Sequence, residues 1–240
     1  QKLGMCGGMP PGVEMNPLHT HPLATLKDFS ACCLRLWKDK LGQISLAVTT
    51  LFWGAGATLQ FIVIAWSDEA LGFGLSQASI LQGVVAAGIA AGAIIASLRV
   101  SLDRAVTVIP LGIAMGVIVI LMNFVREVWV AIPLLILIGG LAGFFVVPMN
   151  ALLQHRGHHL MGAGRSIAVQ NFNENASILI MIAGYSALIK NGISIYLAVT
   201  AFGLFVAGTM TLVRAWHGRN LRRHGDEVQA LLAVARSAHH

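Results

Sequence analysis

The side chains with the greatest chemical potential lie in one short polar run inside an otherwise apolar stretch of the chain. Glu174 is the acidic residue of this run. An ionisable side chain inside an apolar helix is costly and marks a functional site by default. Helical spacing places Asn171, Glu174 and Asn175 on one face, and Gln170 begins a second polar stripe. We expect these groups to line a wet cavity that binds a polar ligand. The alternative is a hydrogen-bond network that only holds helices together.

Further polar side chains interrupt neighbouring apolar stretches. Asn150 lies near the end of the preceding stretch, at a depth similar to that of Gln170, so the two can share a polar patch. Trp53 and Gln60 interrupt the first apolar stretch, and a glutamine there needs a partner or a cavity. We therefore count Asn150, Gln60 and Trp53 among the candidate substrate-binding residues.

Two polar segments between apolar stretches carry charge or histidine. The segment HRGHH at 155–159 has closely spaced histidines, but no acidic or cysteine ligand accompanies them, so we expect no metal and no cofactor. Arg156 and Arg165, in what we expect to be a solvated loop, are suited to meeting phosphate groups of lipid or substrate. Asp103 and Arg104 form a tight turn that can pair charge across helix ends, in a gating or structural role.

These side chains must be positioned by helices that cross a membrane. The chain is 56% hydrophobic and 11% charged, with a mean hydropathy of +0.75, whereas a soluble domain needs more charge to cover its surface. The apolar residues form six blocks of spanning length, with none of the alternation of a barrel. The blocks cover about residues 42–66, 75–98, 105–122, 129–153, 166–189 and 193–213. The sequence predicts an all-α polytopic membrane protein.

The pattern divides the chain into four expected segments. They are a flexible N-terminal arm at 1–26, a cytoplasmic interfacial helix at 27–41, a six-helix transmembrane bundle at 42–213 and a basic cytoplasmic tail at 214–240. In the second segment Phe29, Cys33, Leu36 and Trp37 recur at helical spacing, which is typical of an amphipathic surface helix. The tail has an apolar stripe beginning at Val228, which fits either a docked helix or a solvated segment.

The distribution of lysine and arginine predicts the orientation. Fourteen of these residues fall on one side of the six blocks, and two, Arg126 and Lys190, fall on the other. Because cytoplasmic segments carry the excess of positive charge, we expect both termini in the cytoplasm. The net charge of +6 lies between apolar blocks and not along one surface stripe, so it does not indicate a nucleic-acid partner.

Small residues and prolines within the blocks suggest how the helices pack. Glycine pairs four residues apart predict close helix approach, and prolines at 110, 133 and 148 are expected to bend their helices. The glycine pairs are Gly88 with Gly92, Gly112 with Gly116, and Gly139 with Gly143.

Three segments carry a resemblance to a known family. They are LAVTTLFWGAGAT at 46–58, FFVVPMNALLQHRG at 144–157 and GAGRSIAVQNFNEN at 162–175. Together with the Asp103-Arg104 turn, which resembles a degenerate loop signature of the major facilitator superfamily, they resemble the C-terminal half of the bacterial lysophospholipid transporters. The likeness covers about residues 22–223.

This resemblance implies a non-enzymatic protein that flips lysophospholipids, chiefly lysophosphatidylethanolamine, across the bacterial inner membrane. It implies membrane lipids as partners, a cytoplasmic acyltransferase that uses the delivered lipid, and either a missing N-terminal six-helix half or a second copy of the chain. We favour a fragment over a natural half. By the same resemblance Glu174, Asn171 and Asn175 would hold the headgroup. The alternatives are an exporter of a small solute or drug from the same superfamily and a structural membrane subunit.

Overall fold

The computed structural model describes residues 22–237, and this part of the chain is helical without strands. Six of its helical segments are long and apolar enough to cross a membrane, which confirms the predicted all-α fold with six spans. The elements are α1 Pro22–Lys38, α2 Gly42–Leu71, α3 Leu75–Arg99, the 3₁₀ segment η1 Leu102–Val108, α4 Ile109–Leu121, η2 Met122–Phe124, α5 Val128–Met161, α6 Ala163–Lys190, α7 Ile195–Arg223 and α8 Gly225–Ser237. Most of the expected N-terminal arm lies outside the described residues.

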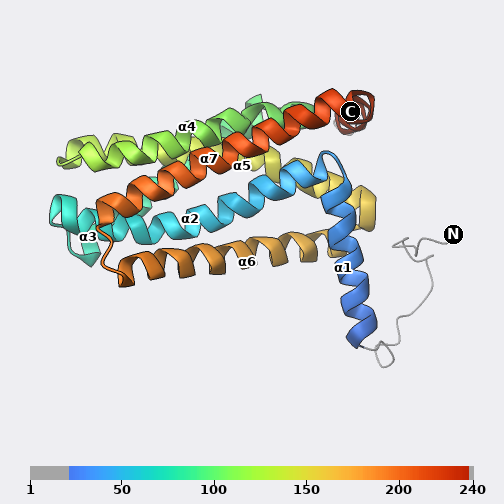
Figure 1. Cartoon of the computed structure of the whole chain (residues 1–240). Helices are drawn as coiled ribbons and strands as arrows, with labels where there is room; N and C mark the ends of the chain where they lie inside the picture. Colours follow the sequence, from blue (N-terminus) through green and yellow to red (C-terminus); the bar gives the residue numbers. More distant parts are fainter. Residues whose placement is uncertain (1–21, 238–240) are drawn as a thin grey trace.

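Successive spans run antiparallel because short connectors join them, and α1 crosses one end of the bundle (Figure 1). α2 is the central helix and contacts α3, α5, α6 and α7. α3 packs chiefly on α5, and α4 packs chiefly on α7. α6 rests mainly on α2 and leaves most of its surface outside the bundle. The helix that carries the polar run is thus one of the least enclosed.

Glycines bring α3 and α5 into backbone contact, as their spacing predicts. A Cβ atom added at Gly88 would lie 2.5 Å from the carbonyl oxygen of Ile136, and one at Gly92 would overlap Gly140. From the other side, Gly139 and Gly143 face the backbone of α3 in the same way. The absence of side chains lets the two helices approach to a distance that any larger residue would prevent.

The third span differs in its first third from the continuous helix that we expected. Residues Leu102–Val108 form a 3₁₀ segment, and the α-helix begins only at Ile109. Pro110 therefore stands in the first turn of α4, where its missing N–H leaves no helix hydrogen bond unmade. Gly116, six residues further on, lies against the backbone of Gly203 and Ala207 in α7, as its spacing predicts.

The expected connector between the fourth and fifth spans is wrong. α5 continues without interruption to Met161, so the histidine segment at 155–159 is helical and not a loop. The turn to α6 is made by Gly162 alone, whose φ of 83° lies in the region that favours glycine. Hydropathy marks where the chain leaves the apolar layer, whereas the helix persists as long as its hydrogen bonds and packing allow.

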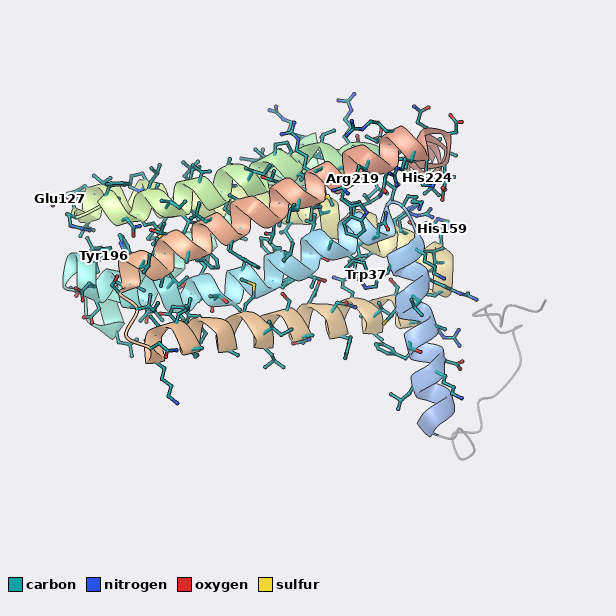
Figure 2. The ribbon with its side chains drawn as sticks, in the orientation of Figure 1. Trp37, Glu127, His159, Tyr196, Arg219 and His224 are labelled. Carbon is teal, nitrogen blue, oxygen red and sulfur yellow. The ribbon has the colours of Figure 1, made fainter. Side chains whose placement is uncertain are left out.

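The two flanking helices dock on the basic end of the bundle, which carries Arg219 and the end of α5 and lies opposite Glu127 and Tyr196 (Figure 2). α1 buries Cys32 and Leu36, and Trp37 stacks on Trp216 of α7 with ring centroids 6.3 Å apart. Burial raises the pKa of the Cys33 thiol above its ordinary value.

The apolar stripe of the tail belongs to a docked helix. α7 continues to Arg223, and α8 then packs on η1 and α7 with Val228 fully buried. Of the two possibilities that the sequence left open, the docked helix is therefore the one that the structure contains. The tail turns back along the basic end instead of extending away from it.

Candidate functional site

The polar run of α6 joins α5 through one buried glutamine. The side-chain amide nitrogen of Gln170 donates to the Asn150 side-chain oxygen at 2.7 Å and to the Glu174 carboxyl at 2.8 Å. Gln170 and Glu174 are only 6% and 8% exposed. Since they are four residues apart, they share the strip of α6 that faces α5 and α2. The shared patch of Asn150 and Gln170 expected from the sequence is present, and it extends to Glu174.

Asn171 and Asn175 do not share the burial of Glu174. Both side chains are exposed, and Asn175 donates from its side-chain amide to the carbonyl oxygen of Asn171 at 2.7 Å. Asn173 similarly returns to the carbonyl oxygen of Val169. The side chains of Asn173 and Asn175 thus turn to their own helix backbone, while Glu174 pairs with Gln170 on the inner side. Part of the polar run consequently faces outward from the bundle.

An apolar cavity lies close to this cluster. It has a volume of about 330 Å³, and residues of α2, α3, α4, α5, α6 and α7 line it, which is within the ordinary size range of small-ligand pockets. Trp53, 43% exposed, and Gln60 are on its wall. Ile178 of α6 is also on the wall, one turn or about 6 Å along the helix from Glu174. The structure therefore brings Trp53 and Gln60 to one cavity and sets Glu174 beside it.

A second glutamine on the cavity wall was not singled out from the sequence. Gln82 of α3 donates from its side chain to the carbonyl oxygen of Gln60 at 2.7 Å, which ties α3 to α2 at this level. Its position in an apolar helix is the same kind of signal that drew attention to Gln60. The two glutamines place polar groups on a wall that is otherwise formed by aliphatic and aromatic side chains.

Arg156 is committed to a partner within the chain. Its guanidinium donates to both carboxylate oxygens of Asp39, from Nη2 at 2.5 Å and from Nε at 3.1 Å, with both side chains buried. Asp39 also accepts from the backbone N–H of Gly42, the first residue of α2, at 2.7 Å. The pair fastens the turn between α1 and α2 to the end of α5. Sequence reasoning missed Asp39, because it is 117 residues away from its partner.

The remaining candidates lie at the basic end without being gathered into the cluster. Arg165 is exposed in the first turn of α6. Asp103 and Arg104 lie in η1, with Arg104 exposed. His155 and His159 form an edge-to-face pair with ring centroids 4.6 Å apart. Among residues 22–237, no three metal-ligating side chains come together as a candidate metal site.

The arrangement can hold an amphiphilic ligand. A carboxyl group and two amides offer charge and hydrogen bonds at one place, and an apolar cavity begins one helical turn away. Six spans and a polar cluster at membrane depth define the class of the chain, which is a multi-pass α-helical membrane protein.

Curated relatives narrow this class to one group of proteins. The chain is 42% identical over 176 residues to a lysophospholipid transporter of Pectobacterium carotovorum. It is 40% identical over 199 residues to that of Escherichia coli O1:K1, and 40% identical over 195 residues to that of Shigella boydii. The aligned parts cover 73%, 82% and 81% of this chain. The chain is a homologue of the bacterial lysophospholipid transporters.

The same alignments cover 43%, 50% and 49% of the three relatives, so the chain spans about half the length of the curated relatives that it matches. No protein-family model and no solved structure matches the chain.

Proposed function

We propose that the chain is the C-terminal half of a lysophospholipid transporter of the major facilitator type, located in the bacterial inner membrane with the basic end in the cytoplasm. The observation that carries the proposal is the cluster of Asn150, Gln170 and Glu174 beside an apolar cavity. A lysophospholipid has one polar headgroup and one acyl chain, and the site offers one polar cluster and one apolar cavity. The similarity to curated transporters supports the same conclusion.

Glu174 is the proposed headgroup contact. It lies eleven residues into α6, about 16 Å along the helix axis from Ala163, so a lipid must leave the interface to reach it. Its carboxylate attracts a headgroup ammonium, and the hydrogen bond from Gln170 holds the carboxyl in place. Lysophosphatidylethanolamine carries such an ammonium and is therefore the proposed preferred substrate.

The acyl chain is assigned to the cavity at Trp53 and Ile178. Its walls are formed mainly by aromatic and aliphatic side chains, so transferring a chain into it removes apolar surface from water. Gln60 and Gln82 add polar groups to the wall, where the glycerol of the lipid can meet them. This placement keeps headgroup and chain about one helical turn apart along α6.

The outward-facing asparagines of α6 are proposed to contact a second six-helix unit. Asn171 and Asn175 are exposed on a helix that packs mainly on α2, and polar groups facing lipid are costly. Transporters of this type work by rocking two repeats around a central site. We assign this face to contact with the other half or with a second copy, which would complete the cavity. A cytoplasmic acyltransferase that consumes the lipid is the further proposed partner.

The test is native mass spectrometry of the detergent-purified chain with lysophosphatidylethanolamine or diacyl phosphatidylethanolamine. We expect the chain to retain the lysolipid in preference to the diacyl lipid and Glu174→Gln to weaken this retention about tenfold. Glu69→Gln, which changes an exposed acid at the end of α2, is the matched control and should bind as the parent does.

The alternatives give different outcomes in the same experiment. Equal retention of lysolipid and diacyl lipid by the parent contradicts lysolipid recognition and leaves an exporter of another solute. Unchanged lysolipid retention in Glu174→Gln removes Glu174 from the headgroup site. If Glu174→Gln retains the lysolipid as the parent does but lowers the melting temperature by several degrees, the cluster acts as a structural link between α5 and α6, as in a structural membrane subunit.

A further inference from the structure

A groove outside the proposed substrate site combines two arginines with apolar side chains. It lies where α3 ends and η1 leads into α4, and its volume is about 340 Å³. Arg99 and Arg104 form one part of its lining, and Pro110, Leu111 and Phe144 form another. None of the proposed substrate contacts lines it, although Arg104 was singled out from the sequence as part of a charged turn.

The two guanidinium groups have no acidic partner inside the part of the chain that the structure describes. Both side chains are exposed, and neither forms an ion pair with any of residues 22–237. Thr107 also lines the groove, but its hydroxyl already donates to the carbonyl oxygen of Arg104 at 2.6 Å. The groove therefore presents two positive charges with N–H donors, and no acidic side chain lines it, since Asp103, which precedes Arg104 in η1, is not part of the lining. That combination suits an anion.

The apolar part of the groove decides what kind of anion fits. Pro110 is exposed, while Leu111 and Phe144 are half-buried, and Phe144 follows Gly143, which contacts the backbone of α3. Leu98, next to Arg99, is 77% exposed on the outer surface of α3. Charged donors thus border an outward-facing apolar surface at the end of a membrane span. Basic pockets between spans at this level bind acidic lipid headgroups.

We propose that Arg99 and Arg104 form a binding site for the phosphodiester of an acidic diacyl phospholipid, whose acyl chain lies along Pro110, Leu111 and Phe144. The lipid is a resident ligand at the edge of the bundle and is not the transported substrate. A zwitterionic lipid fits less well because its ammonium is repelled by the two arginines. A free phosphate ester has the charge but gains nothing from the apolar wall.

The experiment measures lipid binding to the purified 240-residue chain by native mass spectrometry. Palmitoyl-oleoyl phosphatidylglycerol is titrated against the phosphatidylethanolamine with the same acyl chains. We expect a clear preference for phosphatidylglycerol, and Arg99→Gln or Arg104→Gln should each weaken its binding by roughly fivefold. The double Arg99→Lys, Arg104→Lys variant keeps the charges and should retain most of the preference. Raising the salt concentration should reduce it.

Two controls separate the site from general basicity. Arg222→Gln removes an exposed arginine in the last turn of α7 and should leave the lipid preference unchanged. Glycerol 1-phosphate at millimolar concentration should not displace the lipid. Equal binding of phosphatidylglycerol and phosphatidylethanolamine by the parent overturns the proposal. So does an unchanged preference for phosphatidylglycerol in both the Arg99→Gln and the Arg104→Gln variants. Full displacement by glycerol 1-phosphate overturns the assignment to a lipid and leaves a phosphate site.

Discussion

Arg156 and Asp39 form a bidentate buried ion pair that joins the end of α5 to the turn between α1 and α2. The same carboxylate accepts from the first N–H of α2, so one side chain fixes the positions of three helices. A charge that is buried at this junction is stable only while its partner is present. The pair holds α1 across the basic end, where its Phe29 ring meets Phe172 of the polar run edge-to-face.

Removing either member of this pair should destabilise the chain strongly. Arg156→Gln leaves the Asp39 carboxylate without its counter-charge, at a cost of about 3–5 kcal/mol. Asp39→Ala should cost about 1 kcal/mol more, because it also removes the acceptor at the start of α2. Thermal unfolding in detergent measures both effects. The double variant should be more stable than the sum of the single effects predicts, and strict additivity would show that the pair contributes no coupling.

Alanine substitution should have opposite effects on stability at Gly92, which lies in the contact between α3 and α5, and at Gly184, which lies outside it. Gly92→Ala places a methyl group against the Gly140 backbone, so we expect a loss of about 1–3 kcal/mol and a lower melting temperature. Gly184→Ala in α6 meets no atom within 4 Å and should stabilise its helix by about 0.5–1 kcal/mol. Equal responses of the two variants would contradict the close approach of the two helices.

Gln170 should act on ligand binding through Glu174. Gln170→Leu removes the donor to both Asn150 and Glu174 and leaves their oxygens short of a partner, which costs about 1–3 kcal/mol. We expect a several-fold loss of lysolipid retention together with a lower melting temperature. Gln229→Leu, an exposed position in α8, is the control. Unchanged lysolipid retention in Gln170→Leu would remove this residue from the supporting role.

The orientation of the bundle can be tested at its two ends. In a variant whose three cysteines are replaced by serine, Lys190→Cys and Arg222→Cys each carry one reactive thiol. A membrane-impermeant maleimide added to intact spheroplasts should label Lys190→Cys, because the basic end is expected in the cytoplasm. Arg222→Cys should react only after permeabilisation. The reverse pattern would place the basic end outside.

The spans and their closest contacts could be predicted from the sequence, whereas the arrangement of the candidate site could be predicted only in part. Six apolar blocks become six spans because their length matches the membrane, and Gly88 and Gly143 meet backbone because no other residue permits the approach. Helix ends in polar segments were missed. α5 continues through its histidines to Met161, where hydropathy carries no information about the hydrogen bonds that prolong it.

Spacing placed Glu174 on one face with Asn171 and Asn175, whereas the structure pairs its carboxyl with Gln170. Glu174 is four residues from Gln170 and three from Asn171, and either neighbour fits a shared helical face. The position of Asn150 on α5 determines which face of α6 is buried. Its side chain accepts a hydrogen bond from Gln170, and Asn171 is then exposed on the outer side of α6. The partner of Arg156 was missed for a related reason, because a contact across 117 residues leaves no trace in local spacing.

The turn at Gly162 has a mechanical consequence. α5 and α6 are joined by one residue in a conformation that favours glycine, so the joint has no slack with which to absorb a tilt of either helix. A tilt of α6 would therefore act directly on the last turns of α5, where Arg156 is paired with Asp39. The Gly162 turn and the Arg156–Asp39 pair therefore connect α6, α5 and α1 mechanically at the basic end.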